Sequence, residues 1–118
     1  MKILVCEDDF MMLKTIEHKL KSENFEVDLA KDGKVAFEKL KQSDYDLVIT
    51  DLLMPFSTGL EVINYIRKEL NKNTPIIVLS KIGMENTVLQ AFDIGADEYI
   101  VKPFSPNELI IRIKKLLR

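Results

Sequence analysis

The sequence predicts a doubly wound α/β domain built on a five-stranded parallel sheet. Strand-like runs alternate with helical patterns from end to end, without an internal repeat or a low-complexity segment. Four of the five runs are continuously apolar, which is typical of parallel strands that are buried on both faces. The chain has 118 residues, the size of one domain, so we expect residues 1–118 to form a single unit.

The expected strands cover residues 2–6, 25–29, 46–50, 75–79 and 98–101. In the second, apolar Phe25, Val27 and Leu29 alternate with Glu26 and Asp28, a pattern that favours a half-buried edge strand. The first strand is apolar throughout and is expected inside the sheet. The strand order 2-1-3-4-5, with right-handed crossovers, satisfies both expectations.

Apolar residues at helical spacing predict a helix after each strand. Their apolar faces are marked by Leu13, Ile16 and Leu20, by Val35, Phe37 and Leu40, by Val62, Ile63, Ile66 and Leu70, by Val88, Leu89 and Phe92, and by Leu109, Ile110, Ile113, Leu116 and Leu117. Asp32 opens the second helix and Gly95 ends the fourth. The fifth has the clearest start, with Ser105 as N-cap, Pro106 at the first position and Glu108 closing a capping box.

Composition excludes several classes of function. The net charge of −2 gives no sign of a nucleic-acid surface, and no Gly-x-Gly-x-x-Gly or P-loop indicates a nucleotide site. No apolar stretch reaches the roughly 18 residues of a membrane span, and the N-terminus has no signal peptide, so we expect a cytoplasmic domain without a membrane partner. The single cysteine, Cys6, is expected to be a small buried hydrophobe.

Polar side chains follow four of the expected strands at the points where the strands end. Glu7 and Asp8 follow the first strand, Asp51 the third, Ser80 the fourth and Lys102 the fifth. The carboxyl ends of parallel strands meet at one edge of a sheet, which is where such sheets bind ligands. We therefore expect these side chains to line one pocket.

The carboxylates of this pocket require a counter-charge. Two ionised carboxylates about 4 Å apart repel by about 4 kcal/mol at an effective dielectric of 20. An all-oxygen cluster suits a hard divalent cation, Mg²⁺ or Mn²⁺. Asp9 is instead expected to cap the first helix. Asp51 is either a metal ligand only or also a nucleophile, because a carboxylate can attack a phosphoryl group to form an acyl phosphate. Lys102 would supply the opposing cation and Ser80 a hydroxyl donor.

Four motifs resemble the receiver domain of two-component response regulators. They are residues 4–9 (LVCEDD), 51–55 (DLLMP), 78–80 (VLS) and 99–104 (YIVKPF). Each motif alone is weak, but all four occur in order on the expected strand ends, and together they span essentially the whole chain. The resemblance implies the flavodoxin-like (βα)5 fold. Residues 102–109 resemble the OmpR/PhoB subfamily, whose output domains bind DNA.

The resemblance implies roles for the acidic residues. Asp51 would accept a phosphoryl group from a phosphohistidine on a sensor histidine kinase. Asp8 and Asp51 would bind Mg²⁺ directly, together with the main-chain carbonyl of Leu53, and Glu7 would act nearby through water. The domain would catalyse only its own phosphorylation and dephosphorylation, so it is not expected to be an enzyme that turns over an external substrate.

The resemblance also implies a switch. Lys102 would pair with the phosphoryl oxygens, Ser80 would hydrogen-bond them, and Tyr99 would change rotamer in response. The phosphorylated domain would dimerise through the fourth helix, fifth strand and fifth helix, and DNA would be bound only by an output domain outside this chain. The expected dimer residues are Leu89, Phe92 and Ile110, ringed by Asp97, Glu98, Glu108, Arg112 and Lys114.

Three departures from the family pattern affect this interpretation. Val88 stands where the subfamily has a basic partner in the dimer, which puts one ion pair in doubt. Lys81 follows Ser80 where a small residue is usual, and it either crowds the phosphoryl site or adds positive charge to it. Leu53 and Ile82 occupy the two positions that gate the attacking water. Neither side chain can orient a water by hydrogen bonding, so we predict slow self-dephosphorylation.

Two other classes of function compete with the switch. A phosphatase or phosphotransferase of the haloacid-dehalogenase type would need a second aspartate two residues after the nucleophile, where this chain has Leu53. A receiver-like binding module that is never phosphorylated would usually lack part of the acidic cluster or the lysine, and both are present here. Modification by a small phosphodonor separates these alternatives from the switch.

Overall fold

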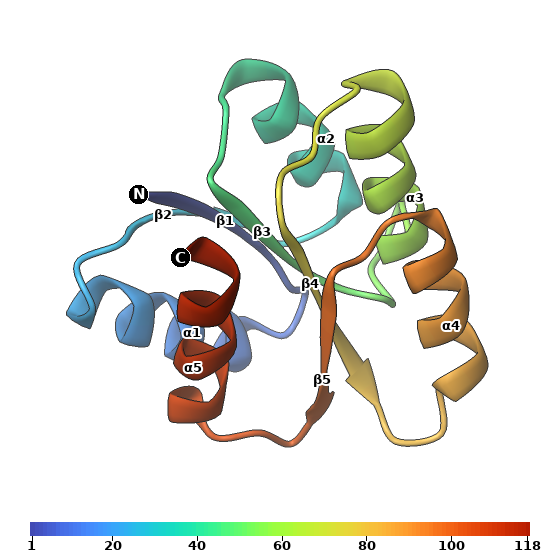
Figure 1. Ribbon diagram of the computed structural model, residues 1–118. Coiled ribbons are helices and arrows are strands. Elements are labelled where there is room, and N and C mark those ends of the chain that lie inside the picture. The colour runs from blue at the N-terminus through green and yellow to red at the C-terminus, as the bar shows by residue number, and fades with distance from the viewer.

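The computed structural model describes residues 1–118 and has five parallel strands in the order β2-β1-β3-β4-β5 (Figure 1). The predicted fold class and strand order are confirmed. The strands are β1 (Lys2–Cys6), β2 (Glu26–Ala30), β3 (Leu47–Asp51), β4 (Ile76–Lys81) and β5 (Glu98–Lys102). β2, β3 and β4 each begin one residue later than predicted. The strands β3, β4 and β5 also end later than predicted, because the ladder pairs Asp51 with Leu79 and Lys81 with Lys102, past the apolar runs.

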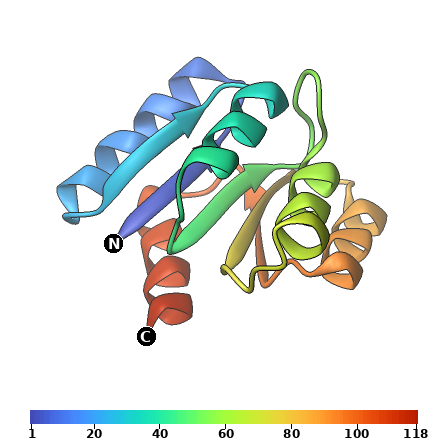
Figure 2. The same cartoon turned by 90° about the horizontal axis from the view of Figure 1, so that it is seen from above.

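Helices cover both faces of the sheet (Figures 1 and 2). One face packs against α1 (Phe10–Ser22) and α5 (Pro106–Leu117). The other packs against α2 (Gly33–Gln42), α3 (Gly59–Asn64) and α4 (Glu85–Ile94). Residues of β1 alternate between the two cores, with Ile3 and Val5 in the first and Leu4 and Cys6 in the second. This alternation explains why the central strands read as continuously apolar runs.

Local sequence signals set the helix starts. Ser105 caps α5 by accepting a hydrogen bond from the backbone N–H of Glu108 at 3.2 Å, as predicted. The other half of the predicted capping box is wrong, since the Glu108 carboxylate lies 3.6 Å from Arg112 instead. The complete capping box is at α3, between Thr58 and Glu61. After α3 the chain continues as a π-helical turn, Tyr65–Glu69, which the apolar spacing did not predict.

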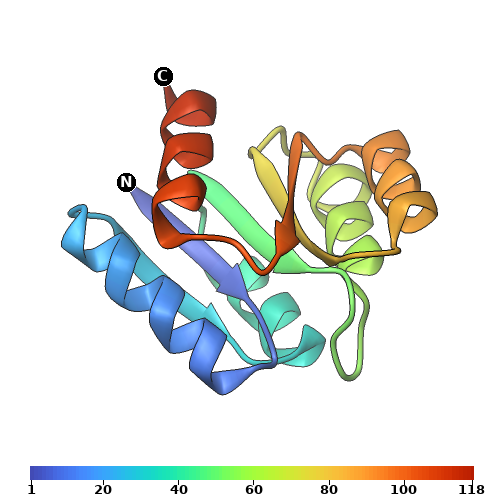
Figure 3. The same ribbon diagram turned by 90° about the horizontal axis from the view of Figure 1, so that it is seen from below.

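The sheet has one edge for the chain termini and another for the loops that carry the predicted site. Both termini lie together at the amino edge of the strands in all three views (Figures 1 to 3). The loops after β1, β3, β4 and β5 meet at the opposite, carboxyl edge. No helix is long and apolar enough to cross a bilayer. Cys6 is buried, as predicted, and His18 is exposed.

Candidate functional site

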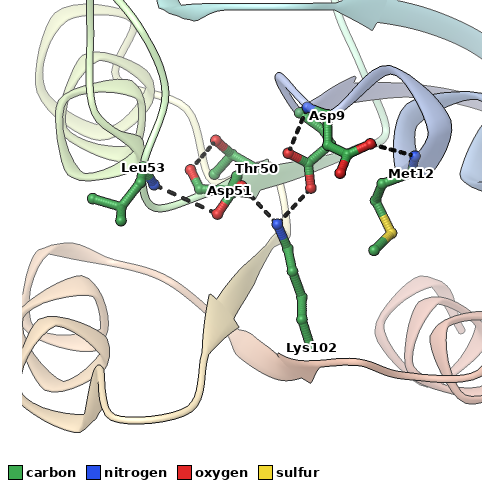
Figure 4. Close-up of polar contacts among 7 residues, drawn as sticks. Asp9, Met12, Thr50, Asp51, Leu53 and Lys102 are labelled. Carbon is green, nitrogen blue, oxygen red and sulfur yellow. Dashed lines mark hydrogen bonds and ion pairs between the residues drawn. The ribbon is translucent and has the colours of Figure 1, made fainter.

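The predicted polar side chains lie at the carboxyl ends of their strands, and Figure 4 shows Asp51 and Lys102 in contact there. Glu7 follows β1, Asp51 ends β3, Ser80 lies near the end of β4 and Lys102 ends β5. Glu7, Asp51 and Ser80 expose 0%, 4% and 1% of their surface, respectively. Charged side chains are rarely so buried unless they are paired, so this burial marks a site whose groups depend on one another.

Lys102 bridges the two buried carboxylates. Its Nζ lies 2.6 Å from Glu7 Oε1 and 2.7 Å from Asp51 Oδ2. Burial raises the pKa of Glu7 to about 7, even though the lysine opposes this shift. Burial also disfavours the charge on Lys102, but its hydrogen bonds and ion pairs with Asp51 and Glu7 outweigh that effect and raise its pKa. The ammonium group therefore stays charged and partly neutralises the cluster.

A third carboxylate completes an all-oxygen cluster. Asp8 is exposed, and the carboxylate oxygens of Glu7, Asp8 and Asp51 lie within 4.8 Å of one another. Three acids with one lysine leave a negative excess, and oxygen ligands open to water on one side are the donor set that Mg²⁺ prefers. Asp9 does not join this cluster, because its carboxylate accepts a hydrogen bond from Met12 N at 3.1 Å and caps α1, as predicted.

Ser80 presents an unpaired polar atom to the site. Its Oγ is buried and has no hydrogen-bond partner in the structure. Nearly all buried polar atoms are hydrogen-bonded, so an unpaired hydroxyl at the ligand-binding edge of the sheet indicates that a bound ligand supplies its partner. An acceptor-rich anion next to Asp51 and Lys102 would fit that requirement. The Lys102–Pro103 peptide bond is cis.

Two further residues, Thr50 and Gly59, fix the backbone at Asp51. The buried hydroxyl of Thr50 donates to the carbonyl oxygen of Asp51 at 2.9 Å (Figure 4). At Gly59, an added Cβ would lie 2.3 Å from the same oxygen, so the first turn of α3 can approach β3 only because this residue has no side chain. Leu53 N lies 3.5 Å from Asp51 Oδ1.

The residues that depart from the family pattern lie around the pocket. Lys81 is exposed and takes part in no ion pair, whereas Val88 is buried in the core and supplies no charge. Leu53 and Ile82 are 50% and 80% exposed, and Figure 4 shows the Leu53 side chain directed away from the carboxylates.

An apolar groove of about 380 Å³ runs from Ser80 along the side of the molecule between β5 and α4. Tyr99 and Phe92 are among the residues that line it, and their rings meet edge to face at 5.8 Å. Tyr99 is 40% exposed, so its ring points outward in this structure. The groove thus connects the buried hydroxyl to the surface that was predicted to respond to it.

Comparison with known proteins decides the family. The model of the response regulator receiver domain matches residues 3–114. The chain belongs to this family. The receiver domain is 44% identical over 117 residues to the transcriptional regulatory protein ResD of Bacillus subtilis and 42% identical over 117 residues to the response regulator ArlR of Staphylococcus saprophyticus. These matches confirm the family that the four motifs predict, and the transcriptional regulators among them fit the OmpR/PhoB subfamily.

Solved structures agree with this assignment. The receiver domain of the Francisella response regulator 1452 superposes with a TM-score of 0.89 at 34% identity, over 98% of this chain and 95% of that one. The curated relatives are longer: the match covers 99% of this chain but 48% of ResD and 52% of ArlR. The chain therefore spans about half the length of these relatives, and the comparisons identify the domain rather than the output of a whole protein.

Proposed function

We propose that this receiver domain is a phosphoacceptor switch in which Asp51 takes a phosphoryl group from a sensor histidine kinase. One observation carries the proposal: Asp51 is almost buried, yet it contacts the Lys102 ammonium, clusters with two further carboxylates, and pairs in register with Leu79, next to the unpaired Ser80 hydroxyl. A purely structural ion pair would need only Lys102 and one acid. It would not explain the third carboxylate or the unpaired hydroxyl of Ser80.

The acidic cluster fits a divalent cation. Glu7, Asp8 and Asp51 would hold Mg²⁺ or Mn²⁺, and the main-chain carbonyl of Leu53 is the fourth proposed ligand. When bound, the cation would neutralise the carboxylates and the oxygens of an incoming phosphoryl group. Lys102 already performs part of this neutralisation, because it contacts both buried acids.

The transfer itself requires few groups. A carboxylate oxygen of Asp51 attacks phosphorus, the bond between phosphorus and the histidine nitrogen breaks, and the imidazole leaves with the electron pair of that bond. Lys102 would contact the transferred oxygens, and Ser80 would donate a hydrogen bond to them. The product adds roughly −1.5 to −2 charge and three strong acceptors beside Ser80, which gives that hydroxyl its missing partner.

The response would travel from Ser80 along the groove to Tyr99. Movement of the loop after β4 toward the phosphoryl group would change the shape of the groove that Tyr99 and Phe92 line, and with it the packing of their rings. We propose that this alters the surface formed by α4, β5 and α5, favours a homodimer through that surface, and controls a DNA-binding output domain elsewhere in the full-length protein.

The charges proposed for the dimer ring already have partners within the chain. Arg112 lies 3.0 Å from Glu98, Lys114 lies 2.9 Å from Glu23, and Asp97 lies 3.0 Å from Arg67. Dimerisation through these residues would therefore exchange intrachain ion pairs for interchain ones. Such an exchange changes the total energy little. The expectation that Ile110 joins the dimer contact is wrong, because it is 6% exposed and packs in the core, so Leu89 and Phe92, 61% and 37% exposed, would have to supply the net stability of the dimer.

Incubation with acetyl phosphate tests the proposal. With Mg²⁺, the wild-type chain should gain the mass of one phosphoryl group, and Asp51→Asn should gain none. Asp46→Asn is the matched control, because it changes an exposed aspartate at the amino edge, and it should be labelled like wild type. Continuous release of phosphate from a generic phosphomonoester would instead support the phosphatase alternative. No labelling of wild type would support an unmodified binding module.

A further inference from the structure

Exposed apolar side chains surround the charged pocket. We call this set of residues the apolar rim: Phe10 (66% exposed), Met11 (73%), Leu53 (50%), Phe56 (78%) and Ile82 (80%). They belong to the start of α1 and to the loops after β3 and β4, all at the carboxyl edge of the sheet. Single exposed apolar residues are ordinary, but a group of them beside buried carboxylates marks a contact surface.

Phe56 differs from the rest of the rim in its backbone. Its φ is 73°, in the left-handed region that a bulky side chain rarely adopts. The Ser57 N–H donates to the Pro55 carbonyl at 2.9 Å, which closes a three-residue turn centred on Phe56. Turns of this kind with a positive φ are rare and strained.

The loop around Phe56 is held in place on both sides. The same Pro55 carbonyl also accepts from Gly33 N at 3.0 Å, and Gly59 N donates to Leu52 O at 2.9 Å. These hydrogen bonds fix the turn, yet the phenyl ring packs on little of its own chain, since it is 78% exposed. Strained residues persist where function maintains them, and the exposed ring itself gains little from packing on its own chain.

The burial of Asp51 restricts which surface can contact the Phe56 ring during phosphoryl transfer. Asp51 exposes 4% of its surface and Glu7 none. A histidine side chain can therefore deliver a phosphoryl group to Asp51 only when the surface of its own protein rests on the rim. Because the rim consists of exposed apolar side chains, the part of the donor surface that meets it should be apolar as well.

We propose that Phe56 is a partner-specificity residue that packs against an apolar patch beside the phosphohistidine of the donor kinase. This inference rests on the proposed function of Asp51. Phe56 takes no part in the chemistry: it selects the protein that donates the phosphoryl group, and the strained turn presents its ring to that protein.

The test compares two phosphodonors. The first is acetyl phosphate, which needs no docking surface, and the second is a panel of purified, autophosphorylated sensor histidine kinases. The variants are Phe56→Gly, which removes the ring and relieves the backbone, and Phe56→Leu, which keeps an apolar side chain. Ile111→Ala is the matched control, because Ile111 is 67% exposed on α5 and lies outside the rim.

We compare the phosphorylation rate with the fastest kinase to the phosphorylation rate with acetyl phosphate. For Phe56→Gly this ratio should fall about tenfold, which is the effect expected from losing one well-packed aromatic contact. Phe56→Leu should recover part of the ratio, and Ile111→Ala should keep all of it. The melting temperature of Phe56→Gly should rise, because glycine adopts this φ without strain. A merely structural role for Phe56 would not combine a more stable fold with a slower kinase reaction.

Several results would overturn the inference. An unchanged ratio for Phe56→Gly, or an equal loss with both donors, would mean that Phe56 does not select the donor. Labelling of wild type by acetyl phosphate but by no kinase would exclude the proposed partner, and a wild-type dimer that Phe56→Gly dissociates would assign the ring to a second copy of the chain. If neither donor labels wild type, the proposed function fails first, and the inference falls with it.

Discussion

Replacing Lys102 with methionine keeps most of the side-chain length and removes the ammonium group that lies 2.6 Å from Glu7 and 2.7 Å from Asp51. The Glu7 and Asp51 side chains are 0% and 6% exposed, so both carboxylates would lose their cation inside the protein. Removing one partner of a buried ion pair costs about 3–5 kcal/mol. Because water reaches the pocket beside exposed Asp8, we expect the lower value, about 3 kcal/mol.

Urea unfolding in Mg²⁺-free buffer measures this loss. Lys81→Met is the matched control, since Lys81 pairs in register with Lys102 but is exposed and has no ion-pair partner. The control should change the free energy of unfolding by less than about 0.5 kcal/mol. Adding Mg²⁺ should then stabilise Lys102→Met more than wild type, because no ammonium group competes for the carboxylates and ligand binding adds to the stability of the native state.

The reasoning fails if Lys102→Met unfolds at the same urea concentration as Lys81→Met. That result would mean that Lys102 is solvated and contributes no net stabilisation to Glu7 and Asp51. Equal stabilisation of wild type and Lys102→Met by Mg²⁺ would also contradict the account, since it would separate the metal site from the lysine.

Further predictions concern three other parts of the domain. Leu53→Asn combined with Ile82→Glu should speed loss of the phosphoryl group, because polar side chains can orient a water that the exposed apolar ones cannot; an unchanged decay of the labelled protein by intact mass would refute this. The Tyr45 hydroxyl lies 2.7 Å from Asp28 and lowers the pKa of that carboxyl. The hydrogen bond therefore stabilises the folded state above the usual aspartate pKa, and this stabilisation is lost as the pH falls through the lowered pKa. Tyr45→Phe should therefore lose about 1 kcal/mol at neutral pH, and its unfolding curve should approach that of wild type as the pH falls below the usual aspartate range; a constant gap would exclude this linkage. Burial raises the pKa of the Cys6 thiol to about 12, so iodoacetamide should modify it in urea but not in the native protein, as mass spectrometry would show; rapid native labelling would contradict its burial.

The sequence predicted those parts of the fold that local chemistry determines. Buried parallel strands read as apolar runs, and the carboxylates of Asp9 and Asp32 and the hydroxyl of Ser105 cap helices because each lies three residues before a backbone N–H that needs a partner. The meeting of Glu7, Asp51 and Lys102 was also predictable, since topology alone brings the ends of parallel strands together.

Contacts that depend on side-chain geometry between distant elements were not predictable. Glu108 fits a capping box by spacing, but the nearby Arg112 draws its carboxylate away. Arg67 gave no signal in the sequence, yet it donates to the carbonyls of Gly95 and Lys72 and pairs with Asp97. These bonds tie the turn after α3 to the end of α4. The positive φ of Phe56 was equally hidden, because its side chain gives no propensity for that conformation.

The central claim is that Asp51 carries the phosphoryl group, and the most direct measurement locates it. Borohydride reduces an aspartyl phosphate to homoserine, which peptide mass mapping identifies by position. After acetyl phosphate with Mg²⁺, homoserine should appear at position 51 of the wild-type chain, and it should be absent when the metal is chelated. Homoserine at another aspartate, or a stable phosphate on His18 or Ser80 without conversion at Asp51, would contradict the account.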